Sequence, residues 1–168
     1  FVCYEPIVRL AGGVPVIIAT EFKDEFKLTA EKLKAAITPK TKMLVLPFPN
    51  NPTGSIMTKE ELEEIASLIR DTNIMVLSDE IYAEMTYGGL RHTSIASIPD
   101  MWEHTIIVNG FSKAYAMTGW RMGFLCAPAP LIKQMLKIHQ YAIMCAPTTS
   151  QFAAVEALRN GDDDIQMM

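Results

Sequence analysis

The sequence predicts an α/β fold, in which a mostly parallel sheet is flanked by helices on both faces. Two observations predict it: strand-sized apolar runs alternate with segments of helical spacing, and polar loops follow several of those runs. The chain has 168 residues, of which 49% are hydrophobic, so it can bury a sizeable core. No repeat or linker divides residues 1–168, and we expect them to belong to one domain.

Five segments are expected to form strands. Val14–Thr20 is a β-branched run preceded by two glycines, and Lys42–Phe48 is a second apolar run. Ile74–Leu77 and Thr105–Val108 have the length and composition of buried strands. Gly119–Cys126 is interpreted as an antiparallel or edge strand. Continuous apolar runs of this kind are typical of a parallel sheet that is covered by helices.

Four segments have helical spacing. Leu28–Ile37 has Thr29 as its expected N-cap, and Thr58–Glu61 is a capping box that starts the second helix. Two further helices are expected at Pro130–Ile143 and Thr148–Asn160. The second helix is expected to bury one apolar face, formed by Leu62, Ile65, Ala66 and Ile69.

Composition excludes several classes of function. The formal net charge is −4 and no basic block occurs, which argues against a nucleic-acid surface. No apolar run reaches the length of a membrane span. Cys3, Cys126 and Cys145 lie far apart and without metal-ligand spacing, so we predict no metal site. They are interpreted as buried free thiols of a cytoplasmic protein.

A lysine loop follows the strand predicted at Thr105–Val108. Lys113 lies in a mostly uncharged segment, with Arg121 eight residues later. Such a lysine can form a Schiff base with an aldehyde cofactor, while the arginine binds its phosphate and Ser112 adds a donor. An isolated lysine is more often a surface residue, and an isolated arginine can serve a structural ion pair. Apolar neighbours argue against full exposure of the lysine: Phe111, Ala114, Ala116 and Met117.

Two upstream motifs supply the other polar groups that pyridoxal phosphate requires. Asp79 follows an apolar run, and its carboxylate can keep the cofactor's ring nitrogen protonated. Tyr82 and Asn51 can both donate to the phenolic oxygen. In isolation, capping is the commoner role for such an aspartate and core packing for such a tyrosine. The asparagine motif is typical of a turn, and a turn could itself aim Asn51 at the ring. All three motifs follow separate predicted strands, so we expect them to meet in one crevice.

Together the motifs resemble those of the class I/II aminotransferases, which are pyridoxal-phosphate enzymes of fold type I. The match runs from Phe1 to Gly123 and weakly into Gln151–Leu158. The resemblance implies transfer of an amino group from an L-amino acid to a 2-oxo acid, with Lys113 as Schiff base and proton carrier. It also implies that Phe1 stacks on the cofactor ring. The other residues carried over by motif are Asn51, Asp79, Tyr82, Arg121 and Ser112.

The chain also departs from the family pattern. Some members have a phosphate-binding serine where this chain has Gly110. Family members are much longer, with an N-terminal phosphate loop, a tyrosine donated across a homodimer, and a small C-terminal domain that binds the substrate carboxylate. Residues 1–168 are therefore expected to be part of the cofactor-binding large domain and to lack useful transaminase activity in isolation. Tyr4, Tyr115 and Met117 are interpreted equally well as pocket or core residues.

Two alternatives share the same motifs. Related enzymes use them for carbon–sulfur bond cleavage, and some transcription regulators carry an aminotransferase-like domain as an effector sensor. A 2-oxo acid acceptor distinguishes a transaminase from a lyase, and a basic domain upstream would indicate a regulator. A third reading, an α/β domain whose site has decayed, conflicts with the presence of the five main polar positions.

Overall fold

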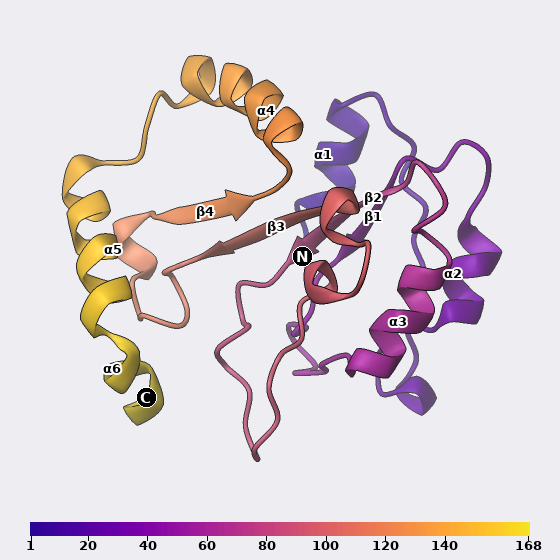
Figure 1. Cartoon of the computed structure of the whole chain (residues 1–168), viewed down its shortest axis with the longest axis horizontal. Helices are drawn as coiled ribbons and strands as arrows, with labels where there is room; N and C mark the ends of the chain where they lie inside the picture. The colour runs from indigo at the N-terminus through magenta and orange to yellow at the C-terminus, as the bar shows by residue number, and fades with distance from the viewer.

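The computed structural model describes residues 1–168 and contains one sheet of four strands in the order β1-β2-β3-β4. The strands are β1 (Met43–Leu46), β2 (Met75–Asp79), β3 (Thr105–Gly110) and β4 (Gly123–Cys126). β1, β2 and β3 are parallel, and β4 runs antiparallel to β3 at the edge (Figure 1). The prediction of a mostly parallel sheet flanked by helices is confirmed.

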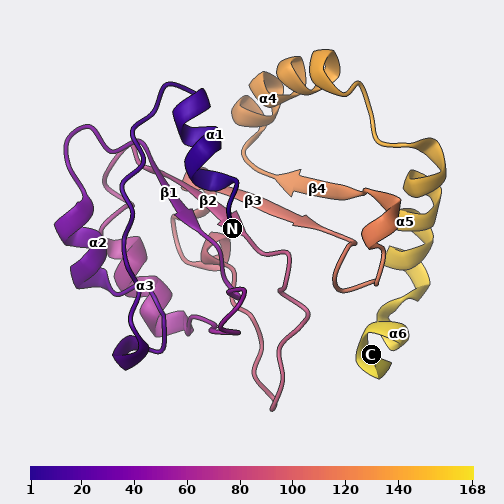
Figure 2. The same cartoon turned by 180° about the vertical axis from the view of Figure 1, so that it is seen from behind.

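Six helices surround the sheet: α1 (Tyr4–Leu10), α2 (Ala30–Ala36), α3 (Lys59–Ser67), α4 (Ala129–Ala142), α5 (Thr148–Asn160) and α6 (Asp162–Met167). Figures 1 and 2 show α3 and α1 on opposite faces of the sheet. The faces are covered unequally, since α1 and α4 contain no buried residue. No helix combines the length and the apolar character needed to cross a lipid bilayer.

The main core lies between the sheet and the two helices α2 and α3. Its members come from α2, β1, β2 and the face of α3 that was predicted to be buried. They include Leu33, Leu44, Val76, Leu62 and Ile65. Thr58 caps α3 as expected, since its hydroxyl accepts from the Glu61 N–H while the Glu61 carboxylate accepts from the Thr58 N–H at 2.7 Å. The cap fixes where α3 begins and therefore which of its residues face the core.

We expect Ile65→Ala to lower the free energy of unfolding by about 2–5 kcal/mol, because the side chain is fully buried and its loss leaves a cavity. Urea titration of the purified protein measures the change. Glu64→Ala is the matched control in the same helix, since this side chain is exposed and its loss should cost less than about 0.5 kcal/mol. Equal midpoints for the two variants would contradict the assigned core.

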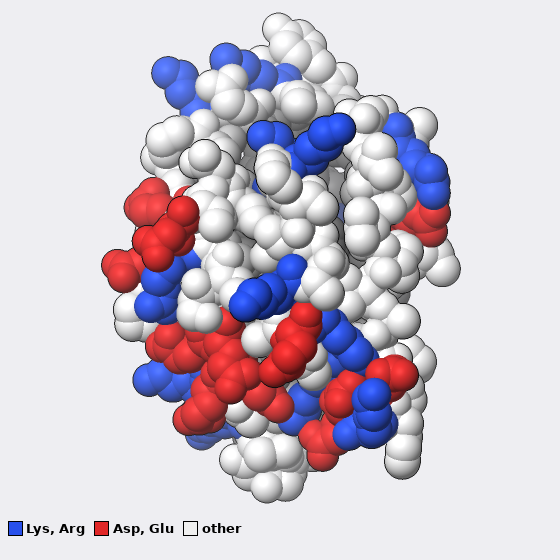
Figure 3. Space-filling view, turned by 90° about the vertical axis from the view of Figure 1, so that its right-hand side faces the viewer, with Lys and Arg blue, Asp and Glu red and all other residues white.

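Charged side chains of both signs are interspersed on the face that carries α2 and α3 (Figure 3). Lys27 pairs with Glu61 at 3.0 Å, and Lys32 pairs with Asp24 at 2.7 Å. These ion pairs join the segment before α2 to both helices. The outer surface of this layer is therefore polar, while its inner surface forms the core.

Val14–Thr20 is not a strand, which corrects the prediction. The segment has no assigned strand structure, and Val14 and Ile17 are 85% and 71% exposed. A β-branched run becomes a strand only where a neighbouring strand accepts its backbone hydrogen bonds, and no strand of the sheet pairs with this segment. Gly119–Cys126 is likewise shorter than expected, because Thr118–Trp120 forms a 3₁₀ turn before β4.

The three cysteines are free, as predicted, but they are not buried. Cys126 is exposed because every residue of the edge strand β4 is exposed, and Cys145 is exposed in the connection between α4 and α5. Cys3, just before α1, is half-buried.

Candidate functional site

The three polar motifs lie at the carboxyl ends of neighbouring parallel strands. The loop after β1 carries Asn51, β2 ends at Asp79 with Tyr82 in the turn that follows, and the loop after β3 carries Lys113. Because parallel strands end at the same edge of a sheet, the order β1-β2-β3 brings these loops together. The expectation of one shared crevice agrees with this topology.

The loop after β1 is a hydrogen-bonded turn that presents Asn51. The Asn50 N–H donates to the Ser55 carbonyl at 2.9 Å, and the Gly54 N–H donates to the Asn50 carbonyl at 2.8 Å. Gly54 adopts a φ of 73°, which favours glycine. The Asn51 amide donates to the Tyr82 hydroxyl at 3.1 Å. The turn interpretation of this motif is confirmed, and the turn places the Asn51 amide against Tyr82.

Lys113 lies over the face of Tyr82, with its Nζ 5.7 Å from the ring centroid. Its loop is anchored by Phe111 and Met117, which pack with Ala154 of α5. Lys113 itself is exposed, contrary to the expectation drawn from its apolar neighbours. Phe111, Ala114 and Met117 are buried, whereas Ala116 is exposed like Lys113, whose amine lies over Tyr82. This places an amine beside the Asn51–Tyr82 pair.

Tyr4 is a contact that sequence reasoning did not assign. Its hydroxyl donates to Oδ2 of Asp79, and the other carboxylate oxygen, Oδ1, accepts from the Ile81 N–H at 3.3 Å. Burial, followed by the hydrogen bond and charge of Asp79, raises the pKa of Tyr4, so the hydroxyl remains protonated as a donor. The aspartate is thus oriented by a helix on the Asp79 face of the sheet. The only sequence signal was a tyrosine three residues after the aromatic Phe1.

The remaining predicted residues have no hydrogen bond to Asn51, Tyr82 or Lys113 and make other contacts. Arg121 adopts a φ of 52°, and its guanidinium donates to the Thr118 carbonyl at 2.9 Å and forms no ion pair with a carboxylate. The Ser112 carbonyl accepts from the Thr118 hydroxyl at 2.8 Å. Phe1 is 80% exposed, and its ring meets Tyr4 edge to face at 6.0 Å.

Gly110 has a structural reason. It pairs with Gly123 across β3 and β4, and a Cβ built at Gly110 would lie 2.9 Å from the Gly123 Cα. Real side chains do not approach backbone so closely. A serine at position 110 would therefore require β4 to move away from β3.

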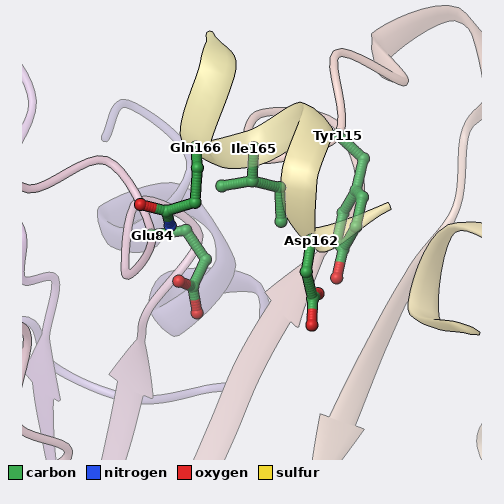
Figure 4. A pocket seen from close by; sticks show the side chains of 5 residues that line it. All are labelled: Glu84, Tyr115, Asp162, Ile165 and Gln166. Carbon is green, nitrogen blue, oxygen red and sulfur yellow. The ribbon is translucent and has the colours of Figure 1, made fainter. Parts of the chain in front are cut away.

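One hollow of the surface is separate from this group. It has a volume of about 290 Å³ and is lined by Glu84, Tyr115 and three residues of α6. Figure 4 shows Glu84 and Gln166 on one side of it and Tyr115 and Asp162 on the other. Burial, with the charges of Asp162 and Glu84, raises the pKa of Tyr115. No group of three or more His, Cys, Asp or Glu side chains is arranged to hold a metal ion.

The comparisons with known proteins define the class. The family model described as aminotransferase class I and II matches residues 1–168. The chain is 54% identical to YugH of Bacillus subtilis (strain 168), which is named as an aminotransferase, over 100% of this chain and 43% of that protein. It is 48% identical to aromatic-amino-acid aminotransferase 2 of Thermococcus litoralis, over 95% of this chain and 41% of that protein.

The solved structures agree. An aromatic aminotransferase from Pyrococcus horikoshii OT3 superposes with a TM-score of 0.96 at 46% identity, covering 100% of this chain and 46% of that chain. The chain belongs to the class I and II aminotransferase family, whose members are generally dependent on pyridoxal phosphate. It spans less than half the length of the curated relatives that it matches. Neither the lyase nor the regulator alternative is favoured by these relatives.

Proposed function

We propose that the full-length protein containing this chain is an aminotransferase that moves an amino group from an L-amino acid to a 2-oxo acid. One observation carries the proposal: the Lys113 amine lies over Tyr82, whose hydroxyl already accepts from Asn51. Because that hydroxyl accepts one hydrogen bond, its own proton stays available for a ligand. An amine that can attack an aldehyde therefore lies beside two donors for an anionic oxygen.

The donor set fits pyridoxal phosphate chemically. The Asp79 carboxylate suits the ring nitrogen of that cofactor, and the Asn51 and Tyr82 donors suit its phenolic oxygen. The Lys113 amine suits the aldehyde, and the Arg121 guanidinium, which has no carboxylate partner, suits the phosphate. When bound, the cofactor supplies an aldehyde that captures the substrate amine and a ring that accepts electrons from the substrate Cα.

The residues then have separate tasks. Lys113 would hold the cofactor through its amine, and the same amine, when free, would carry a proton to and from the substrate Cα. Asp79, oriented by Tyr4, would pair with the ring nitrogen, while Asn51 and Tyr82 would donate to the phenolic oxygen. The positions that bind the phosphate and cover the ring are assigned to Arg121, Ser112 and Phe1.

We further propose that residues 1–168 form part of the cofactor-binding large domain of a cytoplasmic homodimer. The exposed apolar residues of the chain support this proposal, since contiguous apolar surface is usually covered in the complete protein. Several of them lie on the Val14–Ile17 segment, on β4 and along α4; examples are Val16, Phe124, Leu136 and Tyr141.

The test uses the full-length protein loaded with pyridoxal phosphate. We expect a visible absorbance band, and borohydride reduction followed by peptide mass analysis should place the cofactor on the peptide that contains Lys113. Adding an amino acid alone should bleach the band, and adding a 2-oxo acid should restore it, because only a transaminase cycles between the two cofactor forms. Keto-acid release without restoration would indicate a lyase instead.

A further inference from the structure

A buried carboxylate lies beside the candidate site and has no task in the proposed reaction. Glu80 follows Asp79 directly and is only 5% exposed. Its Oε1 accepts from the hydroxyls of Ser78 at 2.9 Å and Ser94 at 2.6 Å, and its Oε2 lies 3.0 Å from Nε2 of His92. We call these four residues the Glu80 clasp: Ser78, Glu80, His92 and Ser94.

The clasp is built to hold a charge away from solvent. Burial of the Glu80 carboxylate acts to raise its pKa, but His92, Ser94 and Ser78 outweigh that effect, so the pKa lies below the ordinary glutamate value. Nε2 of His92 lies 3.0 Å from the carboxylate, and neither ring nitrogen of this buried imidazole has another hydrogen-bond partner. A buried charge is costly unless it is paired, so the Glu80 carboxylate is held in place by the groups around it.

The clasp also determines which way the neighbouring residues face. Successive side chains of a strand point to opposite faces, and in β2 the residues Val76 and Ser78 are buried on the core face. Glu80 continues this alternation, and its N–H donates to the Val108 carbonyl at 2.8 Å. Holding Glu80 on the core face therefore keeps Asp79 on the opposite face, where it meets Tyr4.

The other end of the clasp lies on the long loop between β2 and β3, which extends away from the sheet in Figure 1. Ser94 caps the 3₁₀ turn Ile95–Ser97 by accepting from the Ala96 N–H, and Ile95 is almost completely buried in the core. The end of the loop is therefore fixed by the buried Ile95. Ser94 and His92 connect this end of the loop to Glu80.

We propose that the Glu80 clasp is the positioning element that orients Asp79 and Tyr82 toward the cofactor. The identity of the cofactor rests on the proposed function, whereas the geometry rests on the contacts described above. The clasp residues are not among those proposed to hold the cofactor or the substrate. It acts by fixing the backbone of the Asp79–Tyr82 turn on the core side, so the two side chains on the site side are already oriented when the cofactor arrives.

The first test needs no cofactor. In the full-length protein, Glu80→Gln should speed hydrogen exchange of the amides of residues 80 and 83, which are hydrogen-bonded to backbone carbonyls, at least about tenfold relative to the β1 amides, because the charged anchor is lost. Glu84→Gln makes the same charge change at an exposed position of the same turn and should leave that ratio unchanged. Equal exchange in the two variants would overturn the clasp, whether or not the protein proves to be an aminotransferase.

The second test uses the loaded protein. Glu80→Gln should weaken binding of pyridoxal phosphate about 10- to 100-fold and move the pH at which the visible band titrates, as loss of an outer partner does at other cofactor and metal sites. A role in stability alone would lower the melting temperature and leave that pH in place, which would refute a positioning role. Absence of the band from the wild-type protein would instead reject the proposed function.

A milder pair of variants guards against misfolding. Ser94→Ala removes one donor from Glu80 and leaves the carboxylate paired with His92 and Ser78, while Ser94→Thr restores a hydroxyl. We expect the alanine variant to shift exchange and cofactor binding in the same direction as Glu80→Gln and the threonine variant to resemble wild type. Identical behaviour of folded alanine and threonine variants would count against the proposal.

Discussion

Lys113→Ala is expected to lose the covalently bound cofactor and to lower kcat of the full-length protein by at least about 10²–10⁴-fold, the usual contribution of a positioned proton-transfer group. The free energy of unfolding should change little, because Lys113 is exposed and its loop is anchored by the buried Phe111 and Met117. Visible absorbance, peptide mass analysis after borohydride reduction, and steady-state kinetics measure the change together.

Two controls isolate the role of the amine. Lys113→Arg keeps the positive charge over Tyr82 but cannot form the covalent bond, so it should be as inactive as the alanine variant. Lys40→Ala removes an exposed lysine from the turn before β1 and should leave the spectrum and kcat unchanged. If a folded Lys113→Ala protein retained the covalent cofactor, another amine would have to be its attachment point.

Asp79→Ala is expected to cost about 2–5 kcal/mol of transition-state stabilisation, or roughly 30- to 4,000-fold in kcat/KM, because it removes one partner of a charge pair. The effect should fall mainly on kcat, since the carboxylate acts on the cofactor ring and not on substrate binding. Removal of the carboxylate also leaves the Tyr4 hydroxyl without its acceptor. Kinetics at saturating cofactor measure the effect apart from any loss of cofactor affinity.

Milder substitutions of Asp79 and of its partner Tyr4 should reduce activity less than Asp79→Ala does. Asp79→Glu keeps the charge and should retain more activity than Asp79→Ala. Tyr4→Phe leaves the carboxylate and removes one donor to it, so kcat/KM should fall about 10- to 150-fold, the ordinary value of one hydrogen bond to a charged group. Activity in Asp79→Ala equal to that in Tyr4→Phe would show that the carboxylate does not pair with the ring nitrogen.

Local sequence patterns predicted the strands of the central sheet and the polar loops that follow them. The apolar runs around Leu44, Val76 and Ile106 became β1, β2 and β3, and the capping box at Thr58 started α3. These elements were predictable because their signals lie within one segment of chain. The same holds for the motifs, since each polar loop directly follows the strand that delivers it.

The failures have a common physical cause. Val14–Thr20 has the composition of a strand but no strand pairs with it in this sheet, so composition alone could not decide its state. Tyr4 and Asp79 are 75 residues apart, and Glu80 meets Ser94 only because the intervening loop folds back. Contacts between distant parts of the chain leave no periodic signal. Side-chain direction in a loop, as at Lys113, is also decided by packing and not by the neighbours' composition.

The identical order of the strands in the sheet and along the chain bears on how the protein is assembled during synthesis. Each strand pairs with the one made just before it: Met43 meets Met75, and Val76 meets Thr105. The polar loops therefore leave the ribosome in the order in which they stand side by side, and each new strand has a finished template on which to dock. The lysine loop therefore follows the loops of Asn51 and Asp79 in the chain, and Arg121 follows the lysine loop.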